Sequence, residues 1–91
     1  MSKRIDKKIL PGYYKAVYTG KKTFELRKDD ADYQVGDTLV LREWTGTKYT
    51  GHSCECRITY ILRNAERFGL QEGYCILSIS PIVRSSDDKT D

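Results

Sequence analysis

The sequence predicts an α+β domain that is mainly β, with five or six strands and one short helix inserted early. Three observations support this class: strict apolar alternation over residues 52–63, two further strand-like runs at 38–44 and 74–80, and helix-spaced apolar residues before Gly20. Strands that share one apolar face tend to curl into a small barrel, which removes their exposed edges. We therefore expect a small barrel.

The length of 91 residues allows one modest core. We expect a single domain over residues 1–83 and a disordered polar tail over residues 84–91. The sequence contains no apolar run of membrane-spanning length, and its start does not resemble a signal peptide. These features predict a cytoplasmic monomer with no membrane partner.

The charges are unevenly distributed along the chain. Residues 1–28 contain nine Lys or Arg and two acids, a net charge of +7, whereas residues 29–37 contain four Asp and no base. A basic first third indicates an anionic partner such as nucleic acid or phosphate. The alternative is an uneven surface charge without a binding role.

The helix is expected to start at Pro11 and stop at Gly20. Proline suits the first helical position, and glycine readily adopts the left-handed conformation just after a helix. Before it, Ile9 and Leu10 indicate a short strand or an extended entry. The apolar face that this spacing predicts consists of Tyr13, Tyr14, Val17 and Tyr18.

The stretch from Gly20 to Arg27, G-K-K-T-F-E-L-R, joins the helix to the first clear strand, predicted at residues 22–27. Side chains alternate in a strand, so Glu25 and Arg27 share one face and Phe24 and Leu26 the other. Lys21 and Lys22 lie at the junction. The stretch places cations beside an anion on rigid backbone, although a half-exposed strand with solvated charges remains an alternative.

The next strand, T-L-V-L-R-E-W at 38–44, raises a question about Glu43. By alternation Glu43 continues the apolar face of Leu39 and Leu41, where an unpaired carboxylate is costly. We expect Glu43 to be partly buried and to meet Lys22 or Arg27, or to lie at the rim of a cavity. The alternative is that the strand ends before Glu43.

The longest alternating run assigns six residues to the core face: His52, Cys54, Cys56, Ile58, Tyr60 and Leu62. Residues 45–51 are expected to form a hairpin loop and residues 64–73 a loop with a single helical turn. The last strand, at 74–80, directs Cys75, Leu77 and Ile79 to one face. The three cysteines are therefore predicted to be buried, reduced thiols, and a metal cluster involving His52 is the weaker alternative.

Several of these motifs together resemble a known family. The run G-x-K-T-F-E-L-R is followed by Q-V-G-D-T-L-V-L-R-E-W, then I-T-Y-I-L and G-Y-C-I-L-S-I. Over roughly residues 8–80 the chain resembles an ASCH-type domain of the PUA-like superfamily, in a small bacterial and phage branch of uncharacterised function. The resemblance implies a pseudo-barrel with the helix beside its mouth. It also implies a ligand cleft between helix and barrel, with no cofactor.

The resemblance further implies which residues form the site. Related domains bind RNA or modified nucleotides, and some relatives deacetylate N4-acetylcytidine-type nucleosides. In those enzymes a threonine two residues before the arginine is the nucleophile, and Glu25 occupies that position here. Lys22 and Glu25 are therefore the catalytic candidates only if the protein is an enzyme. The candidate ligand-binding residues are Lys21, Lys22, Glu25, Arg27, Glu43 and Trp44.

Three functions follow as hypotheses. The first is a non-catalytic module that binds single-stranded RNA or a nucleotide, with Lys22 and Arg27 on phosphate and an exposed Tyr or Trp44 stacking on a base. The second is a small hydrolase of a modified nucleoside, in which a carboxylate activates water and Lys22 stabilises the oxyanion. The third is an accessory protein that binds another protein. RNA titration and product analysis distinguish the three.

Overall fold

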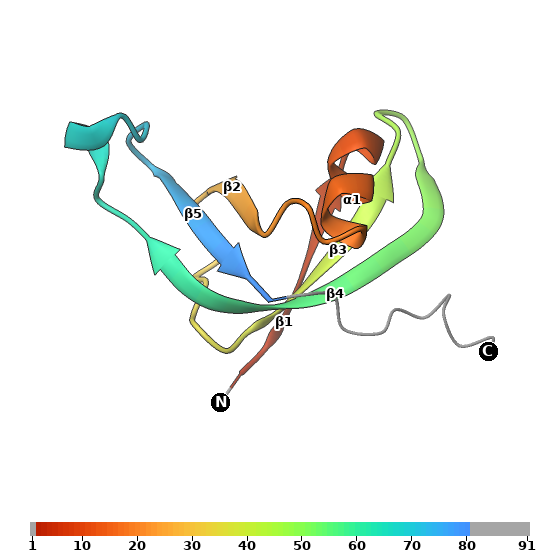
Figure 1. Cartoon of the computed structure of the whole chain (residues 1–91), viewed down its shortest axis with the longest axis horizontal. Helices are drawn as coiled ribbons and strands as arrows, with labels where there is room; N and C mark the ends of the chain where they lie inside the picture. Colours follow the sequence, from red (N-terminus) through yellow and green to blue (C-terminus); the bar gives the residue numbers. More distant parts are fainter. Residues whose placement is uncertain (1, 81–91) are drawn as a thin grey trace.

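The computed structural model describes residues 2–80 and shows a strongly bent five-stranded sheet with a helix on its concave side (Figure 1). The tail expected over residues 84–91 lies outside the described residues. The elements in chain order are β1 (Arg4–Ile9), α1 (Pro11–Tyr18), β2 (Phe24–Lys28), β3 (Thr38–Trp44), β4 (Tyr49–Leu62), the 3-10 helix η1 (Glu66–Phe68) and β5 (Tyr74–Ile79).

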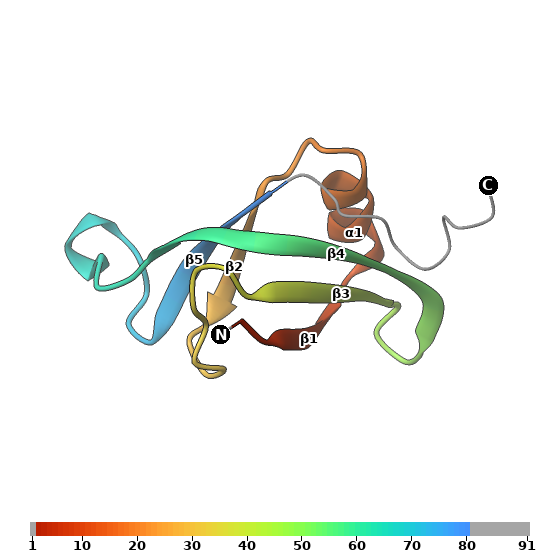
Figure 2. The ribbon, with the colours of Figure 1, turned by 90° about the horizontal axis from the view of Figure 1, so that it is seen from below.

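The sheet is mixed and has the strand order β1-β3-β4-β5-β2. β1 runs parallel to β3, and all other pairs are antiparallel. Figure 2 shows β1, β3 and β4 side by side. The predicted class, mainly β with one N-terminal helix, is confirmed, but the closed barrel is wrong: β1 and β2 are the two edges, and they do not pair with each other. The 14-residue strand β4 connects the two halves.

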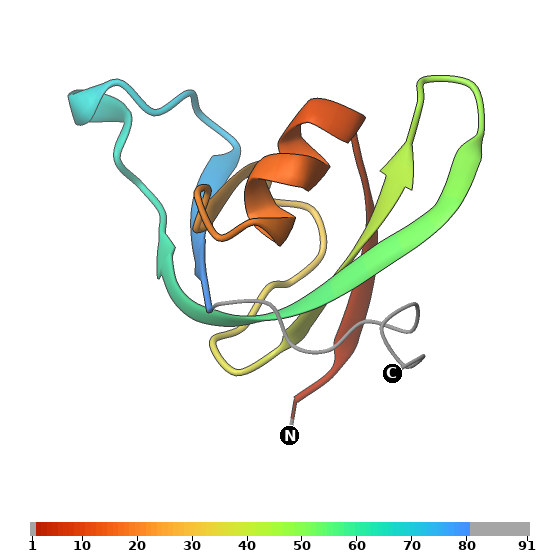
Figure 3. The same cartoon turned by 45° about the vertical axis from the view of Figure 1, so that its right-hand side comes forward.

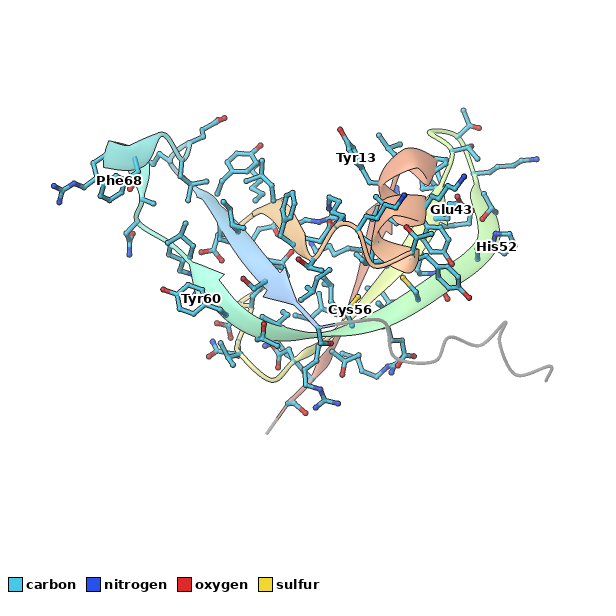
Figure 4. All side chains as sticks on the ribbon, viewed as in Figure 1. Tyr13, Glu43, His52, Cys56, Tyr60 and Phe68 are labelled. Carbon is cyan, nitrogen blue, oxygen red and sulfur yellow. The ribbon has the colours of Figure 1, made fainter. Side chains whose placement is uncertain are left out.

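A register shift in β4 changes which side chains face the core. The irregularity lies between Ile58 and Tyr60, where β4 leaves β3 behind and pairs with β5. Before it, Cys54, Cys56 and Ile58 are buried as predicted, whereas Tyr60 is 60% exposed (Figure 4) and Ile61 packs against the core. An extra residue in one strand reverses the alternation and bends the strand. The expected core positions of Tyr60 and Leu62 are therefore wrong.

The helix α1 lies in the concave side of the sheet (Figure 3). It begins at Pro11 and is followed by Gly20 at φ +84°, as the sequence predicts. Only Tyr14 and Val17 of the predicted apolar face are buried, while Tyr13 and Tyr18 are exposed. The bent sheet therefore covers a narrower stripe of the helix than the spacing indicated. No helix within residues 2–80 is long and apolar enough to cross a membrane.

The hydrophobic core is formed by the inner faces of β1, β3, β4 and β5 together with α1 and Tyr33. Its apolar members include Leu39, Leu41 and Leu77, and the three cysteines, Cys54, Cys56 and Cys75, are buried and form no disulfide, which confirms their predicted burial. We refer to these three as the core cysteines. Burial raises the pKa of the Cys75 thiol, which keeps it protonated at neutral pH.

Asp37 anchors the start of β1 to the loop before β3. Its buried carboxylate accepts hydrogen bonds from the Lys3 side chain at 2.8 Å, the Lys3 backbone N–H at 3.0 Å and the Gln34 backbone N–H at 3.0 Å. Burial alone would raise the pKa of Asp37, but the three hydrogen bonds outweigh it and hold the pKa below its ordinary value. The V-G-D segment therefore has a structural role.

Candidate functional site

A hollow lies between edge strand β2 and the end of edge strand β1, which do not pair with each other. It is a cleft of about 500 Å³. The helix supplies one wall of this cleft through Tyr13. The residues that line this cleft are Lys8, Ile9, Leu10, Tyr13, Lys22, Phe24, Glu25, Leu26 and Arg27.

Glu25 is the centre of the charged part of the cleft. Its side chain faces inward opposite Leu77 of β5, and the residue is only 4% exposed. One carboxylate oxygen accepts a hydrogen bond from Lys22 Nζ, and the other accepts one from Arg27 Nε at 3.0 Å. The alternation predicted for this strand is correct, and the Glu25 carboxylate is paired and buried rather than solvated. The charged face points inward, and Phe24 and Leu26 are exposed.

Arg27 connects the two open edges of the sheet. While Arg27 Nε binds Glu25, Nη2 donates a hydrogen bond of 2.7 Å to the backbone carbonyl of Lys8 on β1. β2 is an edge strand because its other side is paired with β5. The Arg27 side chain thus links the two edge strands, which backbone hydrogen bonds would join in a closed barrel. The cleft lies beside this link.

Aromatic side chains form the outer walls of the cleft. Lys22 Nζ lies 4.8 Å from the ring centroid of Phe24 and 5.6 Å from that of Tyr13, and it also donates a hydrogen bond of 2.7 Å to the Phe24 carbonyl. Tyr13 is 57% exposed. The cleft therefore combines two exposed aromatic rings, which Lys22 contacts, with a cation–anion–cation cluster at its base.

A buried phenol is sensitive to the charge of this cluster. Tyr33 is fully buried, and its hydroxyl has no hydrogen-bond partner among residues 2–80. Desolvation raises the pKa of Tyr33 to about 12, and the nearby positive charge of Arg27 opposes that rise. The phenol therefore stays neutral. Within the same residues, no group of three or more His, Cys, Asp or Glu side chains could hold a metal ion.

Glu43 is partly buried, as predicted, but its expected partners are wrong. Its side chain is 13% exposed and accepts a hydrogen bond from Thr50 Oγ1 at 2.7 Å, with His52 Nδ1 at 3.3 Å. A register shift between Arg42 and Trp44 interrupts the alternation next to Glu43. Thr50 and His52 both lie on β4, the neighbouring strand of the hairpin, and Figure 4 shows His52 close to Glu43. His52 is exposed, so its predicted core position is also wrong.

Trp44 and Lys21 complete the predicted set, and neither lines the cleft among the residues described. Trp44 lies under Lys8, whose Nζ is 4.1 Å from the indole ring centroid. It also packs edge-on against Tyr49, with the two ring centroids 4.9 Å apart. Lys21 is exposed. The structure thus brings together Lys22, Glu25 and Arg27 only. It adds Lys8 and Tyr13 to the residues that line the cleft. In the sequence, only the basic N-terminal segment pointed to Lys8, and only the helix spacing pointed to Tyr13.

These features define a class: a small mixed-sheet domain with an unclosed edge, a charged cluster and aromatic walls. The chain belongs to the family described as Domain of unknown function (DUF3850), whose model matches residues 6–79. It is also similar to an "Uncharacterized 12.9 kDa protein in GpA 3'region" of Escherichia phage P2, with 44% identity over 59 residues. That match covers 65% of this chain and 54% of the phage protein, so the chain spans about half the length of this relative.

Proposed function

We propose that this DUF3850 domain binds single-stranded RNA, one nucleotide of which enters the cleft, and does so without cleaving it. The observation that carries the proposal is the cleft of about 500 Å³ with exposed aromatic walls and a buried, cation-flanked carboxylate at its base. The resemblance to ASCH-type domains supports the same class of ligand. The basic segment of residues 1–28 supplies an attractive field for a polyanion.

The walls suit an unstacked base. RNA recognition targets single strands whose bases stack on aromatic side chains, and stacking contributes about 1–3 kcal/mol per base. Tyr13 and Phe24 offer exposed rings at the mouth of the cleft, from the helix and from β2. Leu10 and Leu26 add exposed apolar surface beside them.

The base of the cleft suits a hydrogen-bond donor. Each oxygen of Glu25 accepts one bond from a protein cation, and a carboxylate oxygen has two lone pairs. A base N–H group, either an exocyclic amino group such as that of cytosine or a ring N–H, could donate to the second lone pair. Glu25 thereby serves as the anion that orients Lys22 and Arg27, which is a binding role and requires no nucleophile.

The test is a titration with labelled single-stranded RNA at several salt concentrations, with the RNA checked for integrity afterwards. Three phosphate contacts would give a log–log salt slope of roughly −2. Tyr13→Ala should weaken binding several-fold, and Tyr60→Ala is the matched control, because both tyrosines are similarly exposed and Tyr60 lies outside the cleft. Lys48→Ala in the hairpin should also leave binding intact.

Three results would contradict the proposal. Absence of RNA binding even at low salt would reject it and favour a protein partner. Loss of RNA integrity, abolished by Glu25→Gln, would instead support the hydrolase hypothesis. Equal effects of the Tyr13 and Tyr60 variants would move the binding surface away from the cleft.

A further inference from the structure

A second hollow, of about 350 Å³, adjoins the cleft and is lined mainly by cationic side chains. Its lining residues are Asp6, Lys7, Lys8, Arg27, Arg42 and Tyr49. Lys8 and Arg27 line both hollows, so the two lie side by side. Four of its six lining residues are cations and one is an acid.

The carboxylates near this hollow leave its cations incompletely neutralised. Lys7 pairs with Asp30 at 3.3 Å, and Arg27 pairs with Glu25. Arg42 lies 3.8 Å from Asp6, beyond hydrogen-bond distance. Lys8 forms no ion pair with any of the described residues and lies instead over the Trp44 ring. Lys8 and Arg42 are therefore available to an anion.

Arg42 is held in a suitable orientation. Its guanidinium carbon lies 4.5 Å from the ring centroid of Tyr49, and its side chain is 47% exposed. Stacking fixes the plane of a guanidinium, whose N–H groups match the oxygens of a phosphate in pairs. The bonds of Arg27 to Glu25 and Lys8 use Nε and Nη2, so Nη1 can still donate from the boundary between the two hollows.

We infer that this second hollow is a phosphate site, so that the domain recognises a nucleotide by its base in the cleft and by its phosphate beside Arg42. This inference rests on the proposed function and makes it more specific. A free nucleoside would occupy only half of the site. The phosphate of a nucleotide and the backbone phosphate of RNA share this chemistry, and inorganic phosphate provides its simplest form.

The experiment is calorimetric titration with cytidine, its 5′- and 3′-monophosphates and inorganic phosphate. For the wild-type protein, one of the monophosphates should bind about tenfold tighter than cytidine, as expected for one added charge-assisted contact. Arg42→Ala should bring that ratio close to one and leave cytidine binding unchanged. Arg67→Ala is the matched control, because Arg67 also stacks on an aromatic ring, that of Phe68 at 5.1 Å, on η1 and outside both hollows.

The outcomes test the phosphate site and the proposed function separately. Cytidine binding with no gain from either phosphate, or a gain that survives Arg42→Ala, would overturn the phosphate site and leave the proposed function standing. Failure of cytidine, both monophosphates and RNA to bind would overturn the proposed function. In that case, binding of inorganic phosphate that Arg42→Ala removes would still support the anion site.

Discussion

Glutamine at position 25 would test whether the buried cluster holds the fold together. Glu25 is 4% exposed, and its carboxylate accepts hydrogen bonds from both Lys22 and Arg27, so Glu25→Gln leaves two neighbouring cations without their shared anion. Breaking a buried ion pair by removing one partner costs about 3–5 kcal/mol. The two cationic side chains keep 16% and 21% of their surface exposed and can turn toward water, which places the cost near the lower end.

A loss of about 3 kcal/mol corresponds to a fall in Tm of roughly 12–24 °C for a domain of this size. The assay is thermal and urea unfolding followed by circular dichroism at neutral pH. Glu55→Gln is the matched control, since Glu55 pairs with Arg4 at 2.9 Å but on an exposed surface. That change should cost less than about 1 kcal/mol.

Equal melting of the Glu25 and Glu55 variants would refute the reasoning. A double-mutant cycle provides an independent check, with Lys22→Met combined with Glu25→Gln. Directly bonded partners should show a coupling energy of about 1 kcal/mol or more. Additive effects would mean that the short contact between Lys22 and Glu25 contributes nothing to stability.

Three further predictions concern the rest of the fold. Asp37→Asn should destabilise the protein at pH 7 and make its stability fall less steeply in acid. Because the pKa of Asp37 is lowered in the folded protein, its contribution to stability is complete above about pH 4 and is lost as the pH falls through the folded pKa. Melting curves of both proteins from pH 7 to pH 2 would test this. The core cysteines should react with thiol reagents slowly in the native protein and rapidly in urea, and rapid native labelling would contradict the assigned strand faces. Glu43→Ala should lower the free energy of unfolding by about 1–2 kcal/mol, more than Glu66→Ala on η1, and Thr50→Val should reproduce part of that loss. Equal melting of the two glutamate variants would refute a structural role for Glu43.

Local alternation predicted much of the sheet because period-two patterns follow directly from strand geometry. It placed Cys75 and Leu77 correctly in the core, and it placed Glu25 and Arg27 on one common face. It did not reveal which face of β2 is the core. Phe24 and Leu26 are apolar, yet they are the exposed pair, because the inner face is neutralised by an ion cluster whose partners come from the same short stretch.

The remaining errors have non-local causes. The register shift near Tyr60 is marked by no glycine or proline, and it depends on β4 exchanging its pairing from β3 to β5. The bond from Arg27 to the Lys8 carbonyl joins residues 19 positions apart and requires the two edge strands to approach each other. No pattern in the sequence indicates that approach. Such features arise from the topology of the whole sheet.

The gap between the edge strands β1 and β2 supports placing the functional site there. Replacing a buried ion cluster by well-packed apolar residues is often neutral or stabilising, so stability alone would not require charges at positions 25 and 27. Apolar side chains there could fill the gap between β1 and β2. The chain instead maintains a charged cluster, a cleft and exposed rings at one place, and local departures from the most stable solution are typical of functional sites. Glu43 and His52, by contrast, close a hairpin end, and their hydrogen bonds are explained by that role alone.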